Sequence, residues 1–170
     1  MPFLLRPHLL AALLGFAAWL VQPAQARVAD GNSAEVLEVR GAGEQRPDAQ
    51  APWLPARPAQ GLRGGAFVRT GEGARMALLF ADDTQIRLNQ RSVLQIRQVS
   101  QQAGEPTTVR LTSGRAWTQT KRAPGQGLQF ETPAATAAIR GTDWDIEVDD
   151  QGRTVMTVFS GSVEFFNDQG

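Results

Sequence analysis

The sequence predicts an all-β fold built from many short strands, arranged as a sandwich, a roll or a solenoid. Apolar and polar residues alternate in about eleven short segments, and turn-forming residues recur between them every 8 to 12 residues or so. Downstream of residue 33, no stretch of about ten residues repeats its apolar positions with the period of a helix. Spacing alone does not order strands, so these three topologies stay open.

Residues 1–26 are typical of a secretory signal peptide. Arg6 precedes an apolar run over residues 9–21, and small residues at 24–26 provide a cleavage site. A helix needs about 20 apolar residues to span a bilayer, so this run is too short for an anchor. We therefore expect a periplasmic or secreted protein with a flexible lead over residues 27–33 and no membrane insertion after signal cleavage.

The composition excludes several classes of function. Basic and acidic residues number 17 each, and removal of Arg6 with the signal leaves a net charge of 16 − 17 = −1. A nucleic-acid partner is not expected, because such proteins carry a clustered basic face. The only histidine is His8 in the signal, and cysteine is absent, so the mature chain offers neither a Ser-His-Asp or Cys-His site nor a zinc site of nitrogen and sulfur ligands. We expect no cofactor.

A proline-rich stretch, residues 44–65, predicts a long surface loop after the first strand, residues 34–40. Each of its four prolines removes a backbone donor and restricts the preceding residue, which disfavours regular sheet or helix. Trp53 is expected to cover an open end of the core. If it is exposed, Trp53 is the best candidate in the chain for stacking on a sugar or a peptide.

The remaining strands are predicted to be short and separate. A hairpin is expected between residues 107–112 and 115–120, because Gly114 can supply the positive φ of a tight connection. Pro133 should end a strand that starts at Leu128. The other predicted strands cover residues 66–70, 74–80, 85–89, 94–97, 134–139, 142–148, 153–160 and 163–166.

Six short motifs follow one another along the chain, centred on Ile139-Arg140-Gly141-Thr142. The motifs are Val68-Arg-Thr-Gly71, Ala77-Leu-Leu-Phe-Ala-Asp-Asp-Thr-Gln-Ile-Arg-Leu88, Leu111-Thr-Ser-Gly114, Phe130-Glu-Thr-Pro133, Ala138-Ile-Arg-Gly-Thr142 and Val158-Phe-Ser-Gly-Ser-Val163. They stand in the order seen in FecR-type domains, so the chain resembles this family over most of residues 34–170. The resemblance implies an all-β periplasmic module, a FecR-like β domain over 34–170, with no known catalytic residues.

The motif residues are expected to specify the fold rather than a reaction. The Arg140 guanidinium, with five donors in a rigid fork, should tie carbonyls or a carboxylate of neighbouring turns, so Arg140→Ala should lower the melting temperature by several degrees. The structural motif residues are Thr132, Pro133, Ile139, Arg140, Gly141, Thr142, Ser160 and Gly161.

The sequence departs from the regulators after which the family is named. Those proteins carry a cytoplasmic anti-sigma segment and a transmembrane helix ahead of this domain, whereas eight residues precede the apolar run here. The family pattern also continues into another hairpin beyond residue 170. The resemblance therefore does not by itself imply direct control of a sigma factor by this chain. We expect either a truncated product or the first part of a longer architecture.

Carboxylates at 143, 145, 147 and 149 alternate with apolar residues and should line one face of a strand. A solvated strand is favoured over a calcium patch or a glycosidase pair, because calcium ligands usually come from a curved loop. Asp82 and Asp149 are expected to form turns with their neighbours Asp83 and Asp150. Trp117, Trp144 and Phe165 are expected in the core.

These observations predict a non-enzymatic periplasmic module that binds a protein or an envelope glycan, or serves as a scaffold. The alternative is a sensory or regulatory component of an envelope signalling system of the iron-uptake type, acting with a separate membrane partner.

Overall fold

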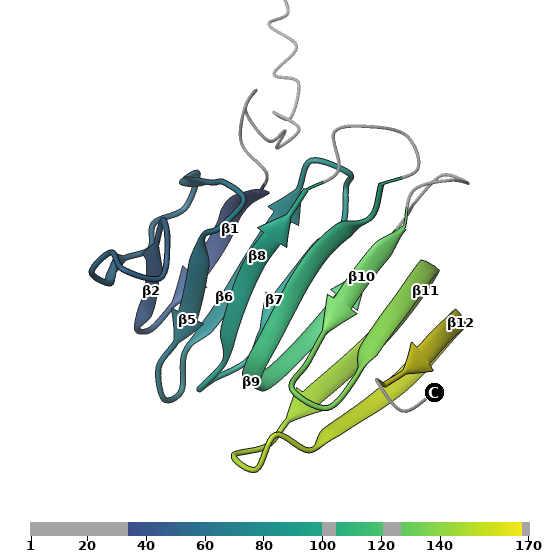
Figure 1. Ribbon diagram of the computed structural model, residues 1–170. Helices are drawn as coiled ribbons and strands as arrows, with labels where there is room; N and C mark the ends of the chain where they lie inside the picture. Colours follow the sequence, from purple (N-terminus) through teal and green to yellow (C-terminus); the bar gives the residue numbers. More distant parts are fainter. Residues whose placement is uncertain (1–33, 100–104, 121–126, 168–170) are drawn as a thin grey trace, which may run out of the picture.

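The computed structural model describes residues 34–99, 105–120 and 127–167, and all its regular elements are strands (Figure 1). The predicted signal peptide and lead lie outside the described residues. In the part of the chain that is described, no helix is long and apolar enough to cross a membrane. The all-β prediction is confirmed. The strands are β1 (Ala34–Arg40), β2 (Gly43–Arg46), β3 (Leu54–Pro55), β4 (Gly61–Leu62), β5 (Phe67–Thr70), β6 (Arg75–Phe80), β7 (Gln85–Leu88), β8 (Val93–Gln98), β9 (Thr107–Gln119), β10 (Leu128–Glu131), β11 (Thr136–Val148) and β12 (Thr154–Phe166).

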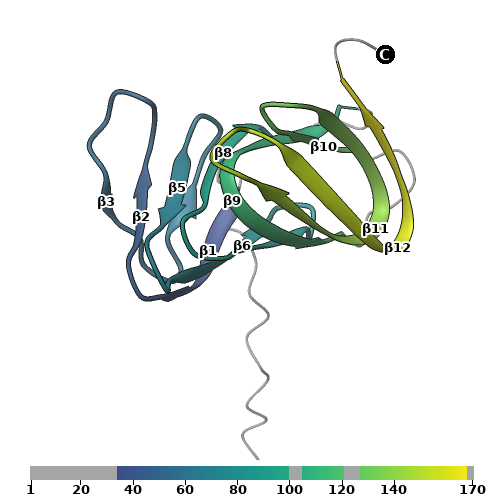
Figure 2. The same cartoon turned by 90° about the horizontal axis from the view of Figure 1, so that it is seen from below.

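The strands form one twelve-stranded sheet that curls into a small barrel-like arrangement. Its main path runs β3-β2-β5-β8-β9-β7-β6-β1-β4. The first half of β9 also pairs with β10, which runs parallel to it, and its second half pairs with β11. Since β10 pairs with β11 as well, these three strands close a ring (Figure 2). β12 pairs with β11 along its whole length.

Each of the three longest strands bends at a glycine with positive φ. β9, β11 and β12 have 13 residues each, and they contain Gly114 (φ 87°), Gly141 (φ 60°) and Gly161 (φ 87°). The sequence prediction of separate strands on either side of these glycines is therefore wrong. Nearest the bend in β9, the buried residues are Val109 and Leu111 before it and Ala116 and Thr118 after it. The bend moves the core-facing side chains from odd to even positions, as a bulge does.

Gly114 has the predicted positive φ, but it lies inside a strand and not in a hairpin turn. The Ser92 Oγ accepts a hydrogen bond from the Arg115 N–H at 3.0 Å and donates one to the Arg115 carbonyl at 3.1 Å. A Cβ at position 114 would stand 2.5 Å from Ser92 Cα and 2.7 Å from the Arg91 carbonyl oxygen. Glycine is required here because another backbone passes against the bend.

The proline-rich stretch is more regular than its sequence suggests. Three short strands, β2, β3 and β4, lie within or at the edge of residues 44–65, so the prediction that regular sheet is absent there is wrong. Gln45 pairs with Leu54, and Glu44 pairs with Pro55. β3 has only two residues and stands at the end of the sheet path, where a proline without an N–H is tolerated.

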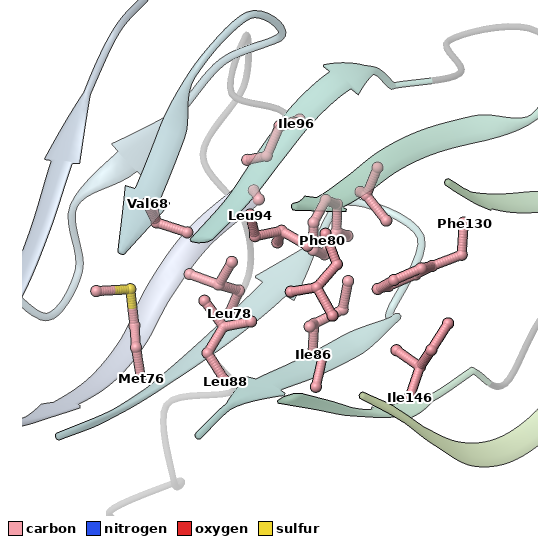
Figure 3. Close-up of a cluster of buried hydrophobic side chains, with 14 of the residues drawn as sticks. Val68, Met76, Leu78, Phe80, Ile86, Leu88, Leu94, Ile96, Phe130 and Ile146 are labelled. Carbon is pink, nitrogen blue, oxygen red and sulfur yellow. The ribbon is translucent and has the colours of Figure 1, made fainter. Parts of the chain in front are cut away.

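Apolar side chains from many strands of the sheet form one hydrophobic core. Figure 3 shows side chains of β5 to β8 meeting Phe130 of β10 and Ile146 of β11. The Phe130 and Trp144 rings pack edge to face, with centroids 4.7 Å apart and planes at 88°. Trp144 is fully buried, which confirms its predicted place in the core.

The predicted core positions of Trp117 and Phe165 are wrong. Trp117 lies between the buried residues Ala116 and Thr118, so its side chain is on the outer face of β9 and only partly buried. Phe165 is on the core side of β12 but is 47% exposed, because β11 is the only strand that covers β12 in the described part of the chain.

Candidate functional site

The outer face of the sheet carries a row of paired side chains that crosses five strands, β1, β6, β7, β9 and β11. Directly paired residues of neighbouring strands lie on the same face. Glu38 pairs with Ala77, Ala77 with Arg87, Arg87 with Trp117, and Trp117 with Asp145. The pairing register therefore brings Trp117 between a guanidinium and a carboxylate.

More arginines flank this row on the same face. Arg40 of β1 pairs with Arg75 of β6, and Arg115 lies two residues before Trp117 on β9. All four arginines of this face are exposed. We call the whole set the Trp117 face: Glu38, Arg40, Arg75, Arg87, Arg115, Trp117 and Asp145.

The Trp117 face contains two adjoining shallow hollows. One has a volume of about 280 Å³ and extends from Glu38 and Arg40 to Arg87. The other, of about 270 Å³, extends from Arg75 and Arg87 to Trp117 and Asp145. Arg75 and Arg87 line both hollows, so a ligand that occupied either one would meet their guanidinium groups.

The charges of this face are only partly paired. Arg115 Nε lies 2.7 Å from Asp145 Oδ1, and Arg40 forms an ion pair with Glu38. Neither Arg75 nor Arg87 forms an ion pair with a carboxylate of the described residues, and the Arg87 guanidinium lies 5.0 Å from the Trp117 ring centroid. The face thus offers two guanidinium groups and an aromatic ring, a combination suited to a ligand with carboxylates and a flat or apolar part.

Sequence reasoning missed the Trp117 face. Strand alternation put Arg75 and Arg87 on solvated faces, but it could not show that β6, β7 and β9 are neighbours. The only available signal was that Trp117 alternates with Ala116 and Thr118, which would put it on the opposite face from them. The bend at Gly114 concealed this signal, because it changes which positions of β9 face the core.

Trp53 is partly buried and immediately precedes β3. Its ring centroid is 4.5 Å from the Arg46 guanidinium carbon and 4.3 Å from that of Arg69, which is paired with Glu44 at 2.6 Å. The Arg46 guanidinium also lies 4.6 Å from the Phe67 ring. Ligand stacking on Trp53 stays a prediction, and a ligand there would compete with two arginines for the ring.

Two of the motif residues form the turn between β10 and β11. The Thr132 Oγ1 accepts a hydrogen bond from the Ala135 N–H at 3.1 Å and donates one to the Ala135 carbonyl at 2.9 Å. The Thr154 Oγ1 donates to the Thr132 Oγ1 at 2.9 Å, which ties the start of β12 to this turn. Pro133 is exposed in the same turn.

The other motif residues surround the bends of β11 and β12. Ile139 and Thr142 are buried, and a Cβ at Gly161 would stand 2.5 Å from Thr142 Cγ2 and 2.8 Å from the Gly141 carbonyl oxygen. Ser160, which is exposed, pairs with Asp143 of β11. The two bends therefore pack directly on each other. Arg140 is part of β11, but its side chain is outside the described part, so its predicted partners stay a prediction.

The predicted turn-forming role of Asp82 and Asp149 is confirmed. Asp82 Oδ1 accepts from the Thr84 N–H at 3.0 Å, and Asp149 Oδ1 accepts from the N–H groups of Gln151 and Arg153, each at 2.9 Å. Desolvation raises the Asp149 pKa, but these hydrogen bonds and the Arg153 guanidinium outweigh it and hold the pKa below its usual value.

The carboxylates of β11 do not act as one group. Asp145 is paired with Arg115, and Glu147 is exposed. Among the residues that the structure describes, no three carboxylates gather in a way that could hold a metal ion.

Comparisons with known proteins agree with this architecture. The profile of the family described as "FecR protein" matches residues 66–164. No curated protein sequence matches the chain significantly. Two crystal structures of a "putative anti-sigma factor" from Parabacteroides distasonis share the fold, with a TM-score of 0.55 and 16% identity. The similarity covers 61% of this chain and 48% of theirs, so it spans about half their length. The family match covers more than half of the chain, and the chain belongs to the FecR protein family.

Proposed function

We propose that this chain is a non-enzymatic binding module of a regulatory or signalling system in the cell envelope. Membership of the FecR family supports a regulatory role. The signal-peptide pattern of residues 1–26 supports a periplasmic or secreted location. The residue types support binding over catalysis, since residues 27–170 contain no histidine and no cysteine.

The observation that carries the proposal is the pair of Arg75 and Arg87 beside Trp117. Neither guanidinium has an acidic partner among the described residues, and such a group can form two parallel hydrogen bonds with a carboxylate of a ligand. Both guanidinium groups are exposed, so the desolvation cost of binding a ligand comes mainly from the water that leaves the two hollows. The ligand class is therefore a carboxylate-bearing partner, either an acidic segment of a protein or a carboxylated envelope glycan.

A capture experiment tests this function. Envelope extract is passed over the immobilised wild-type chain and over the Arg75→Ala/Arg87→Ala variant. Charge-assisted hydrogen bonds contribute about 1.5–3 kcal/mol each, so the variant should bind its partner at least about tenfold more weakly. Protease treatment of the extract should abolish capture of a protein partner, whereas digestion of the cell wall should abolish capture of a glycan.

Arg57→Ala/Arg63→Ala is the matched control, because it removes two exposed arginines outside the Trp117 face. This control should capture as much partner as the wild type. The proposal fails if the Arg75→Ala/Arg87→Ala variant captures the same partner with unchanged affinity, or if the wild type captures nothing from the extract.

In the signalling role, the chain would pass the binding event to a separate membrane partner. Crosslinking in whole cells should then join the wild-type chain to a membrane protein, and loss of that protein should abolish the transcriptional response to the captured ligand. An unchanged response would restrict the chain to binding or scaffolding.

A further inference from the structure

The edge strand β12 has an unusual surface for the rim of a sheet. Its only described neighbour is β11, and its other edge pairs with no described strand (Figure 1). Most of the large exposed apolar side chains of the described residues are on this strand: Val155 (59%), Val158 (42%), Phe159 (59%), Phe165 (47%) and Phe166 (41%). An exposed, long apolar edge is a template for pairing with another strand.

β12 also lacks the features that keep edge strands from pairing. It contains no lysine and no proline, and Glu164 is its only charged residue. Exposed edges of monomeric proteins are usually short or protected by lysine, proline or inward-pointing charges. This strand has 13 residues and one bend. Its composition therefore fits an edge that is covered when the protein functions.

The bend divides β12 into two halves whose core-side residues have opposite parity. Met156 and Val158 pair with the buried residues Ile146 and Trp144, so they are on the core side before the bend. After the bend, Val163 and Phe165 pair with Ile139 and Ala137, which are also buried. Core-side residues of β12 therefore have even numbers before the bend and odd numbers after it.

This parity switch makes the strand symmetric about the Ser160–Gly161 peptide bond. If two β12 strands run antiparallel about a two-fold axis at that bond, Met156 is opposite Phe165 of the second copy and Val158 is opposite Val163. On the outer side, Val155 is opposite Phe166. Glu164 is opposite Thr157, so like charges do not meet. A strand without the bend would place core-side residues opposite outer-side residues in the same arrangement.

The backbone is compatible with the same register. Along a strand, the direction of the backbone N–H and C=O groups alternates together with the direction of the side chain. In an antiparallel pair, two directly opposed residues must either both point these groups toward the other strand or both point them away from it. A register that opposes core-side residues to core-side residues satisfies this condition in both halves of β12. The two-fold pair therefore joins the two sheets with their core sides on one face.

We propose that β12 pairs antiparallel with β12 of a second copy of this chain, about a two-fold axis at Ser160–Gly161. The pairing places the exposed Val155, Val158, Phe165 and Phe166 opposite apolar side chains of the second copy and extends the curled sheet across two copies. An interface in which the same patch meets itself is the expected form of a two-fold dimer.

The first test uses the whole chain, purified as the cell processes it. Light scattering after size exclusion should give twice the mass of one chain at micromolar concentrations. Val155→Lys/Phe166→Lys places lysines opposite each other at both ends of the strand and should give a monomer with the circular dichroism spectrum of the wild type, since both side chains are exposed and on the outer side. Mixing it with Val155→Glu/Phe166→Glu should restore a heterodimer.

Leu54→Lys is the matched control. It introduces the same charge at an exposed apolar residue of β3, the edge strand at one end of the main sheet path. This variant should remain a dimer. A monomeric wild type, a dimeric lysine double variant, a monomeric control, or a mixture of the two charged variants that stays monomeric would each overturn the proposal.

A second test does not depend on charged variants and exploits the absence of cysteine. Thr157→Cys and Glu164→Cys change two exposed residues that the proposed register places opposite each other. Under oxidation, a mixture of the two single variants should give a disulfide-linked dimer, because opposed residues in a strand pair are close enough for a disulfide. Each variant alone should give none. A linked dimer from one variant alone, or none from the mixture, contradicts the register.

Discussion

Gly114→Ala is the sharpest test of the bend in β9. The residue has φ 87°, a conformation that costs an L-residue roughly 1–2 kcal/mol. The new Cβ would also stand 2.5 Å from Ser92 Cα and 2.7 Å from the Arg91 carbonyl oxygen. These are backbone atoms, so the strand itself must shift, and such overpacking typically costs about 1–3 kcal/mol. We expect a total loss of about 2–5 kcal/mol in the free energy of unfolding.

Gly73→Ala separates the two contributions. Gly73 also has positive φ (66°), but a Cβ there meets nothing within 4 Å. This variant should therefore lose only the conformational cost, about 1–2 kcal/mol. Gly114→Ala should be the less stable of the two by about 1–3 kcal/mol, which is the steric contribution alone.

Urea denaturation at 25 °C, followed by far-ultraviolet circular dichroism of the sheet, measures both free energies. The slope of free energy against urea should be the same for both variants, so that differences in midpoint report stability. If the two variants lose the same free energy within about 0.5 kcal/mol, the close approach of Ser92 does not constrain position 114, and the account of the bend is wrong.

Three further predictions concern stability. Gly161→Ala should cost more than Gly141→Ala, because a Cβ at 161 meets the Gly141 carbonyl oxygen at 2.8 Å while one at 141 meets nothing within 4 Å; equal midpoints in urea would contradict the packing of the two bends. Trp144→Ala should lose about 3–5 kcal/mol in the same assay, and Trp117→Ala less than half of that, since Trp144 is in the core and Trp117 on the outer face; comparable losses would refute this assignment. Asp149→Asn should be less stable than the wild type at pH 7, and the difference should shrink as the pH falls below about 4, because a lowered carboxyl pKa stabilises the fold only while the group is ionised; a difference of undiminished size at pH 2.5 would exclude this origin.

Local alternation was enough to predict an all-β chain and most strand positions. Residues such as Ile86 and Leu88 are buried where the period of two placed them. The turn roles of Asp82 and Asp149 followed from their side-chain chemistry. The family motif around Gly141 was visible as a string of residues, and the family match over residues 66–164 agrees with it.

The errors in the bounds of the three longest strands came from glycines that bend a strand without ending it. At Gly114, Gly141 and Gly161 the alternation changes parity, which looks the same in sequence as a turn between two strands. Only the neighbouring strands distinguish a bend within one strand from a turn between two strands, because a bulge is stabilised by the strands that continue past it on either side. The wrong prediction for Trp117 is a direct consequence, because the bend at Gly114 decides which face of β9 its side chain lies on.

The sequence by itself indicated the class of fold, through its short-range periodicity, and the family, through motifs that resemble those of FecR-type domains. It also shows that residues 27–170 contain no histidine and no cysteine. Only the tertiary structure decided that Arg75, Arg87 and Trp117 share one face and that the outer edge of the apolar strand β12 pairs with no described strand. Both features depend on which strands are neighbours and in what register they pair. That information lies in contacts between residues far apart in the chain, and local alternation does not contain it.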